Sequence, residues 1–473
     1  MEKEKSLLKN TIVVAIGRIS TQLITFLLLP LYTTILTTKE FGIVELLNVL
    51  IALILPILTL QIEQGLFRYL IDYRDNEDKK TVLISTILKF VITQAGVYLL
   101  FFIILSFFIK NDYKYFLASN VIVSMFSSIF LQICRGFGDN KNYSIGSFIV
   151  GASTVILNVV FITVFKLGAY GMLGASLISN LLCVLYLFFA NKIYNYVKID
   201  KYDKSVLKES LKYSIPLIPN MISWWIIDAS DRTIISAFLG ISLNGIYATA
   251  NKFSGVFTTI YNIFNLTWTE SASLNIESDD RDIFFSRILD VTIRFFGALM
   301  IGIIAFMPFV FPIMVNEKFA MAYSQIPILM IGSMFSVLVS FFGSIYVAKK
   351  ITKEIAKTSL LAAIINIVIN VILIKHIGLF AASISTLIAY FIMFVYRLID
   401  SRKIVRLKVN YSIVCSLIIL SVATVSGYYL GNIPIRMVLV AIVVIYSVLI
   451  NMKSFKFIIE VIKNREKGFL NKS

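Results

Sequence analysis

Long, uninterrupted apolar runs recur from one end of this 473-residue chain to the other. A helix crosses the roughly 30 Å hydrocarbon core of a bilayer with about 20 such residues. Only α-helices and closed barrels can satisfy their backbone hydrogen bonds within lipid, and barrel strands alternate apolar and polar residues. The runs here are continuous, and the mean hydropathy of +0.86 exceeds that of soluble proteins. The sequence therefore predicts an all-α polytopic membrane protein.

The apolar runs define fourteen predicted transmembrane spans. They cover residues 10–36, 41–62, 81–109, 114–133, 145–166, 170–190, 214–239, 245–269, 289–315, 324–348, 355–375, 379–397, 411–430 and 435–452. The first run is too long for the core of a signal peptide, and no small-residue cleavage site follows it. We therefore expect no cleavable signal.

The distribution of Lys and Arg between the loops predicts the orientation of these spans. With an N-terminus in the cytoplasm, inside segments with their adjacent span ends hold 32 of the 44 basic residues, and outside segments with their adjacent span ends hold 7. Basic residues accumulate in cytoplasmic loops of membrane proteins. We therefore expect both termini in the cytoplasm, and we attribute the net charge of +17 to topology and anionic lipid headgroups. Nucleic acid is not an expected partner.

A weak internal repeat divides the chain. The segment EFGI at 40–43 follows the first span, and LNGI at 243–246 follows the seventh, at an offset of 203 residues. Six spans per half is an even number, so both halves enter the membrane from the same side and form a parallel repeat. We predict an N-terminal six-helix lobe at 1–200, a second lobe at 201–400, and a final helix pair with a cytoplasmic tail at 401–473, with a central cleft between the lobes.

The residue types needed for catalysis or metal binding are scarce. The three cysteines lie in separate spans without metal-ligand spacing, and the single histidine, His376, lies in a short loop. No phosphate-binding loop or nucleotide fingerprint is present. All predicted outside loops are short, which leaves no room for an external catalytic domain. We therefore predict no enzyme activity, no catalytic residues, no metal and no cofactor.

The seventh span carries three charged residues, Asp228, Asp231 and Arg232, in apolar surroundings. A charge near mid-bilayer costs roughly 2.5–3.5 kcal/mol on insertion scales, so such residues usually face a cavity or a partner. One interpretation is an ion pair between Asp228 and Arg232, which are four residues apart on a helix. The other is a polar surface facing a substrate or an ion, with Asp231 lacking a local partner.

Spans one, two and eight also carry polar residues along one helical face. Arg18 and Gln22 lie on one face of the first span, Glu45 lies in the second, and Lys252 and Asn262 lie in the eighth. Arg18 either faces the cleft or extends to the inner interface. Because spans one, two, seven and eight hold equivalent places in the two halves, we expect their polar faces to line a water-filled cleft.

Two further basic residues have two possible roles each. Lys89 in span three either faces the cleft or reaches the interface, and Arg135 at the inner end of span four either meets an incoming phosphate or contributes to the orientation signal. The predicted substrate-facing set is Arg18, Gln22, Lys89, Arg135, Lys252 and Asn262. The predicted ion-coupling or cleft acids are Glu45, Asp228 and Asp231.

Three segments carry a resemblance to a known family. They are LPLYTTILTTKEFGIVEL, from the end of the first span into the second, SDRTIISAFLGISLNGIYATANKF in the seventh and eighth spans, and the Gly-Ala-Ser segments of spans six and twelve. With them, nearly the whole chain resembles the Wzx-type flippases, within the multidrug/oligosaccharidyl-lipid/polysaccharide export superfamily. The resemblance implies two six-helix lobes plus a helix pair in the bacterial inner membrane.

The same resemblance implies that the protein moves an undecaprenyl-pyrophosphate-linked oligosaccharide from the cytoplasmic to the outer leaflet by alternating access. Arg18 and Lys252 would then meet the pyrophosphate, and Glu45 and Asp231 would couple transport to an ion gradient. The implied partners are the lipid-linked glycan, membrane lipids, and a polysaccharide polymerase with its chain-length machinery. The sequence does not define the oligomeric state, and a monomer is compatible with it. The alternatives are a multidrug antiporter of the same superfamily and a membrane-embedded polymerase or ligase.

Overall fold

The computed structural model describes residues 26–108 and 110–470, and this part of the chain is helical and contains no strand. The predicted all-α fold is thus confirmed. The helices form two compact units, residues 1–248 and residues 249–473, which we describe separately. The predicted lobes 1–200, 201–400 and 401–473 rest on the internal repeat and stay a prediction.

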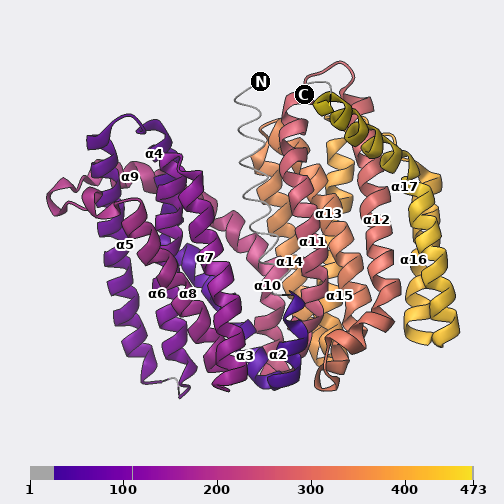
Figure 1. Ribbon diagram of the computed structural model, residues 1–473, viewed down its shortest axis with the longest axis horizontal. Helices are drawn as coiled ribbons and strands as arrows, with labels where there is room; N and C mark the ends of the chain where they lie inside the picture. The colour runs from indigo at the N-terminus through magenta and orange to yellow at the C-terminus, as the bar shows by residue number, and fades with distance from the viewer. Residues whose placement is uncertain (1–25, 109, 471–473) are drawn as a thin grey trace. The chain divides into compact units, whose positions relative to one another are not determined.

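The helices of the first unit are drawn in indigo to magenta in Figure 1. They pack around a buried core that includes Leu83, Met125 and Leu187. Its long elements are α2 (Leu29–Ile35), α3 (Thr38–Thr59), α4 (Ile62–Asp72), α5 (Glu77–Ser106), α6 (Tyr113–Phe137), α7 (Asn140–Val159, extended by a π turn at Val160–Val164), α8 (Gly168–Ala190), α9 (Lys204–Ser214), α10 (Ile218–Phe238) and the first turns of α11 (Ile241–Asn275).

The second unit is built around an aromatic core in which Trp268 stacks on Phe341 with ring centroids 4.6 Å apart. It contains the rest of α11 and then α12 (Arg281–Met314), a 3-10 segment (Glu317–Gln325) leading into α13 (Ile326–Ala348), α14 (Thr352–Ile377), α15 (Leu379–Ser401), α16 (Tyr411–Leu430) and α17 (Ile433–Leu470).

Eleven of the described helices are long and apolar enough to cross a membrane. Each coincides with one of the fourteen predicted spans, and the first predicted span lies largely outside the described residues. Helix α10 falls outside the eleven because every 18-residue stretch of it contains Asp228, Asp231 and Arg232. The predicted number of fourteen therefore stays approximate, whereas the polytopic character is confirmed.

The second predicted span does not end where its apolar run ends. Helix α3 begins with a capping box, in which Thr37 and Glu40 exchange hydrogen bonds between side chain and backbone. It is interrupted by two consecutive residues in the left-handed region, Leu60 (φ 52°) and Gln61 (φ 56°), after which α4 resumes. Such φ values are uncommon for residues with a side chain. The chain therefore bends at a defined point between α3 and α4.

The long segment after α8 ends in a short helix that packs on the first unit. Two 3-10 turns lead to α9, whose first turn is capped by Asp203 through the backbone N–H of Ser205 at 2.7 Å. Helix α9 packs on α4, as both views show, and Gly65 of α4 lies so close to Ser210 that a Cβ would be 2.9 Å from the carbonyl oxygen of that residue. This segment therefore covers one end of the first unit.

Candidate functional site

Helices α3 and α11 cross at a pair of glycines. A Cβ on Gly42 would overlap the carbonyl oxygen of Ile241, and a Cβ on Gly245 would overlap the carbonyl oxygen of Thr38. The contact is reciprocal, because Gly42 and Gly245, like Thr38 and Ile241, are separated by 203 residues. The two copies of the repeat signal thus lie against each other, and only glycine permits this backbone approach.

A buried hydrogen bond reinforces the crossing. The side-chain amide of Asn244 donates to the carbonyl oxygen of Gly42 at 2.8 Å, and Asn244 is fully buried. A side-chain amide left without an acceptor in such a buried place would cost about 1–3 kcal/mol. The crossing is therefore a specific contact as well as a close one.

An ion pair joins α3 to α10 one turn from the crossing. The guanidinium Nη1 of Arg232 donates to Oε2 of Glu45 at 2.9 Å, and the side chains are 19% and 5% exposed. Seven residues earlier on α10, the indole of Trp225 donates to the carbonyl oxygen of Val49 at 2.9 Å. Within the described residues the Nε of Arg232 is buried and has no hydrogen-bond partner. The guanidinium therefore keeps a donor that is not used.

The neighbouring residue joins α10 to α11. Asp231 is 2% exposed and accepts a hydrogen bond from the hydroxyl of Tyr247 at 2.8 Å. Asp231 and Arg232 are consecutive, so their side chains leave α10 in different directions and reach α11 and α3 respectively. The α3–α10–α11 junction, with Glu45, Asp231, Arg232 and Tyr247, is the candidate functional site of the first unit.

The predicted pairing of Asp228 with Arg232 is wrong. Among the described residues the carboxylate partner of Arg232 is Glu45, which lies 187 residues away in the sequence. Asp231 is buried and accepts a hydrogen bond from Tyr247, whereas Asp228 is exposed, and which of the two faces the cleft stays a prediction. Arg232 instead neutralises a buried carboxylate on α3, a contact that only tertiary packing makes possible.

The remaining predicted site residues lie in several places. Arg18 and Gln22 are outside the described residues. Lys89 is exposed, and its ammonium lies 4.6 Å from the ring centroid of Tyr202. Lys252 is half-buried and Asn262 is exposed, both on the part of α11 that belongs to the second unit.

Arg135, at the end of α6, has aromatic and amide neighbours. Its guanidinium lies 4.4 Å from the ring centroid of Phe67 and 5.6 Å from that of Tyr143, and it donates to Oε1 of Gln132 at 3.2 Å. A guanidinium stacked in this way gains cation–π energy without neutralising its charge. Arg135 therefore remains suited to an anionic ligand.

Besides Lys80, two buried charged residues were not predicted as site residues. Arg397 on α15 is 1% exposed and donates to Oγ1 of Thr358 at 2.8 and 3.0 Å and to the carbonyl oxygen of Val339 at 2.9 Å. It thereby ties α15 to α14 and α13. In the sequence Arg397 closes an apolar run, where it contributes to the orientation signal and gives no sign of burial.

Glu63, in the first turn of α4 beyond the end of the second span, is the other. It is 8% exposed, and within the described residues its Oε2 has no hydrogen-bond partner. Burial raises the pKa of this carboxyl group above its usual range. Glu63 differs from a surface glutamate in lying directly after the bend at Leu60 and Gln61, and this bend is visible only in the structure.

Together the fold and the junction define a polytopic helical membrane protein with a charged, buried helix junction. Solved structures with the same fold include the lipid II flippase MurJ in an inward closed conformation (TM-score 0.68, 15% identity, 94% of this chain and 100% of that one). Another is a multidrug resistance transporter of the MATE family, of the MOP superfamily, in an inward-facing conformation (TM-score 0.63, 11% identity, 82% and 98%). At these identities the likeness shows the fold alone.

The sequence comparison places the chain in a family. The family model described as polysaccharide biosynthesis protein matches residues 7–268, which is more than half of the chain. The chain therefore belongs to the polysaccharide biosynthesis protein family, and the resemblance seen in the sequence is confirmed at this level. No curated protein matches the chain in sequence.

Proposed function

We propose that the protein is a flippase that moves an undecaprenyl-pyrophosphate-linked oligosaccharide from the cytoplasmic to the outer leaflet. The observation that carries the proposal is the charged α3–α10–α11 junction in a membrane protein of the polysaccharide biosynthesis family. Buried charges in membrane spans are costly and usually mark a transport pathway. A scaffold protein of the same family would not need them.

In this proposal the glycine crossing closes the path at its outer end and must open to release the cargo. Backbone contact between two glycines is tight but involves few side chains, so it can separate without exposing much apolar surface. The ion pair one turn away would break or rearrange in the same movement, and the spare donor of Arg232 suits an anionic group of the cargo. Arg18 and Lys252 are proposed to bind the pyrophosphate, and Glu45 to take part in ion coupling.

Deletion of the gene tests the cargo. The deletion strain should accumulate a lipid-linked oligosaccharide on the cytoplasmic face and lose the corresponding surface glycan, and the wild-type gene should restore it. A multidrug antiporter, whose fold is shared, would instead change drug susceptibility and leave surface glycan unaffected. Accumulation of lipid-linked repeat units in the outer leaflet would indicate a polymerase or ligase.

Single cysteines test the proposed orientation, in which both termini are cytoplasmic. The native Cys415 is exposed and is first replaced by serine, whereas the other two native cysteines are buried. Cysteines at Asn111 and Asn432 should then react with an impermeant thiol reagent added outside, and cysteines at Asn76 and Asn195 should not. All four positions are exposed in the structure. The opposite labelling pattern would overturn the direction of transport.

A further inference from the structure

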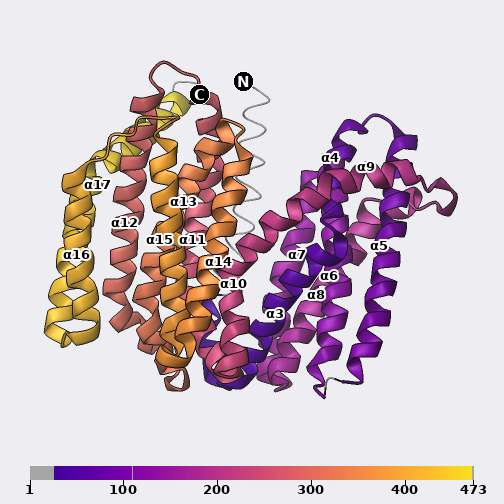
Figure 2. The same cartoon turned by 180° about the vertical axis from the view of Figure 1, so that it is seen from behind.

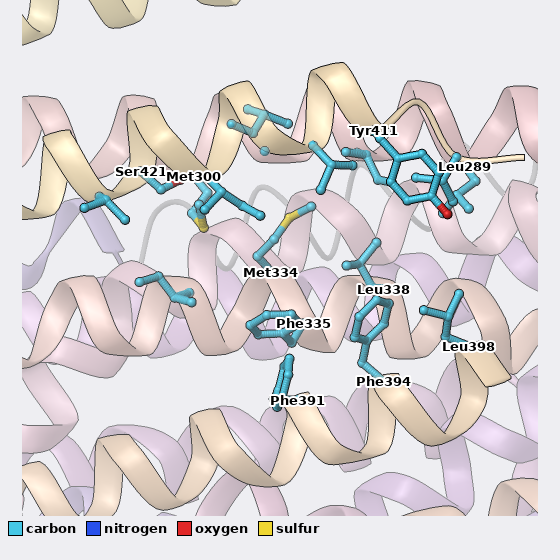
Figure 3. A pocket seen from close by; sticks show the side chains of 18 of the residues that line it. Leu289, Met300, Met334, Phe335, Leu338, Phe391, Phe394, Leu398, Tyr411 and Ser421 are labelled. Carbon is cyan, nitrogen blue, oxygen red and sulfur yellow. The ribbon is translucent and has the colours of Figure 1, made fainter.

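The second unit contains a cavity of about 690 Å³ between α12, α13, α15 and α16. Figure 3 shows Phe335, Phe391 and Phe394 on one side of it, with Met334 and Met300 pointing into it. Apart from a few polar groups its lining is apolar. A cavity with such an apolar lining excludes water and can accommodate an apolar ligand.

One end of the cavity is basic. Arg402, at the end of α15, lines the cavity and is exposed, and the linker at 402–410 that leads to α16 carries four basic residues. The acids nearby are engaged: Asp400 binds Lys403 at 2.7 Å, and Asp282 accepts the backbone N–H of Arg406 at 3.1 Å. Among the described residues Arg402 has no carboxylate partner within salt-bridge distance, so its guanidinium can bind an anion.

The cavity is deep enough to hold a lipid chain of one leaflet. Its lining along α16 runs from Tyr411, which begins the helix at the basic end, to Ser426, and Figure 3 shows Tyr411 and Ser421 far apart along it. Ten residues of helix separate them, which is about 15 Å at 1.5 Å per residue. Half of the hydrocarbon core of a bilayer is also about 15 Å. A chain anchored at Arg402 would therefore extend to the middle of the membrane.

We propose that this cavity binds an anionic glycerophospholipid, with one acyl chain between α12, α13, α15 and α16 and the headgroup phosphate at Arg402. Basic pockets between transmembrane helices at the cytoplasmic side bind anionic headgroups in this way. The bound lipid would fill the space between α16 and the rest of the second unit. The proposal does not depend on the transported cargo, so it stands or falls separately from the flippase function.

Brominated lipids test the proposal, because bromine on an acyl chain quenches a nearby tryptophan. The variant Phe335→Trp places a reporter in the cavity, and its signal is read by difference from the parent protein. The protein is reconstituted in phosphatidylcholine vesicles that contain brominated phosphatidylglycerol or, in a parallel series, brominated phosphatidylcholine. The matched control is Phe101→Trp on α5, whose side chain is 60% exposed at an ordinary lipid-facing position.

We expect the Phe335→Trp reporter to be quenched at a lower mole fraction of phosphatidylglycerol than of phosphatidylcholine, and the Phe101→Trp reporter to show no preference. A basic residue near the surface contributes about 1 kcal/mol to binding of an anionic lipid. Arg402→Gln should therefore reduce the preference about fivefold, whereas Lys141→Gln, at an exposed position of the first unit, should leave it unchanged.

Mass spectrometry of lipid that copurifies with the unaltered protein gives an answer that does not depend on the reporter. Phosphatidylglycerol or another anionic glycerophospholipid retained by the wild type and lost from Arg402→Gln supports the proposal. Equal quenching by the two lipids, or an isoprenoid lipid retained in place of a glycerophospholipid, overturns it. If two copies of the protein pair and thereby exclude lipid from the cavity, quenching would be lost and mass spectra of the intact protein would show a dimer. This result would also overturn the proposal.

Discussion

The glycine crossing makes a quantitative prediction for Gly42→Ala. The added Cβ would overlap the carbonyl oxygen of Ile241, a backbone atom that cannot rotate away, so α3 and α11 must separate. Overpacking of this kind typically costs 1–3 kcal/mol. The separation also stretches the hydrogen bond from Asn244 to Gly42, worth about 0.5–1.5 kcal/mol. Alanine recovers about 0.5–1 kcal/mol because it is the better helix former. The extremes of these contributions are about 0.5 and 4 kcal/mol, and we expect the crossing to weaken by about 1–3 kcal/mol, the middle of this range.

This change is measured as the rate at which a buried cysteine at the crossing is labelled. Ile246→Cys, at a position that is 6% exposed, serves as the reporter in a background with Cys415→Ser. A loss of 1–3 kcal/mol corresponds to labelling about 5- to 150-fold faster. Gly96→Ala is the matched control, because a Cβ there meets nothing within 4 Å. If Gly42→Ala labels no faster than this control, the crossing is looser than the structure indicates and our reasoning is refuted.

Three other substitutions test the buried charges. Arg232→Met should lower the abundance of folded protein by removing the guanidinium that pairs with the buried carboxylate of Glu45, at a cost of up to about 3–5 kcal/mol, and adding Glu45→Gln should restore part of it. Equal abundance of the single and double variants would contradict the pairing. Arg397→Met should lower the free energy of unfolding in mixed micelles by about 3 kcal/mol, because the buried acceptors on Val339 and Thr358 lose their donor. An unchanged unfolding midpoint would show that Arg397 does not hold the three helices together. Burial raises the pKa of Glu63, so the folded state binds its proton more tightly than the unfolded state does. The free energy of unfolding should therefore fall as pH rises from about 4.5 through the pKa of the folded state. Glu63→Gln should remove this dependence, and the same pH profile of unfolding in the variant and the parent would contradict the prediction.

The sequence was sufficient to predict the spans, because the cost of unsatisfied backbone in lipid makes hydropathy a strong constraint. It also located the two glycine segments, which the structure brings together at the crossing. It could not identify the partner of Arg232, since local spacing favours Asp228 and only tertiary packing brings Glu45 within 2.9 Å. Arg397 was missed for a related reason: a basic residue at a span end satisfies the orientation rule whether or not it is buried.

The reciprocal crossing of α3 and α11 resembles the interface of a two-fold symmetric dimer, in which residue i meets j and j meets i. A chain of half this length, with a single such glycine, could make the same contact with a second copy of itself. At the same offset of 203, however, Glu45 corresponds to Ala248 and Arg232 to Leu29. The backbone contact is therefore symmetric at this offset, whereas the ion pair has no symmetric counterpart. If the two halves arose by duplication, the glycine crossing was kept in both copies and the charged pair was acquired at only one of the two equivalent places.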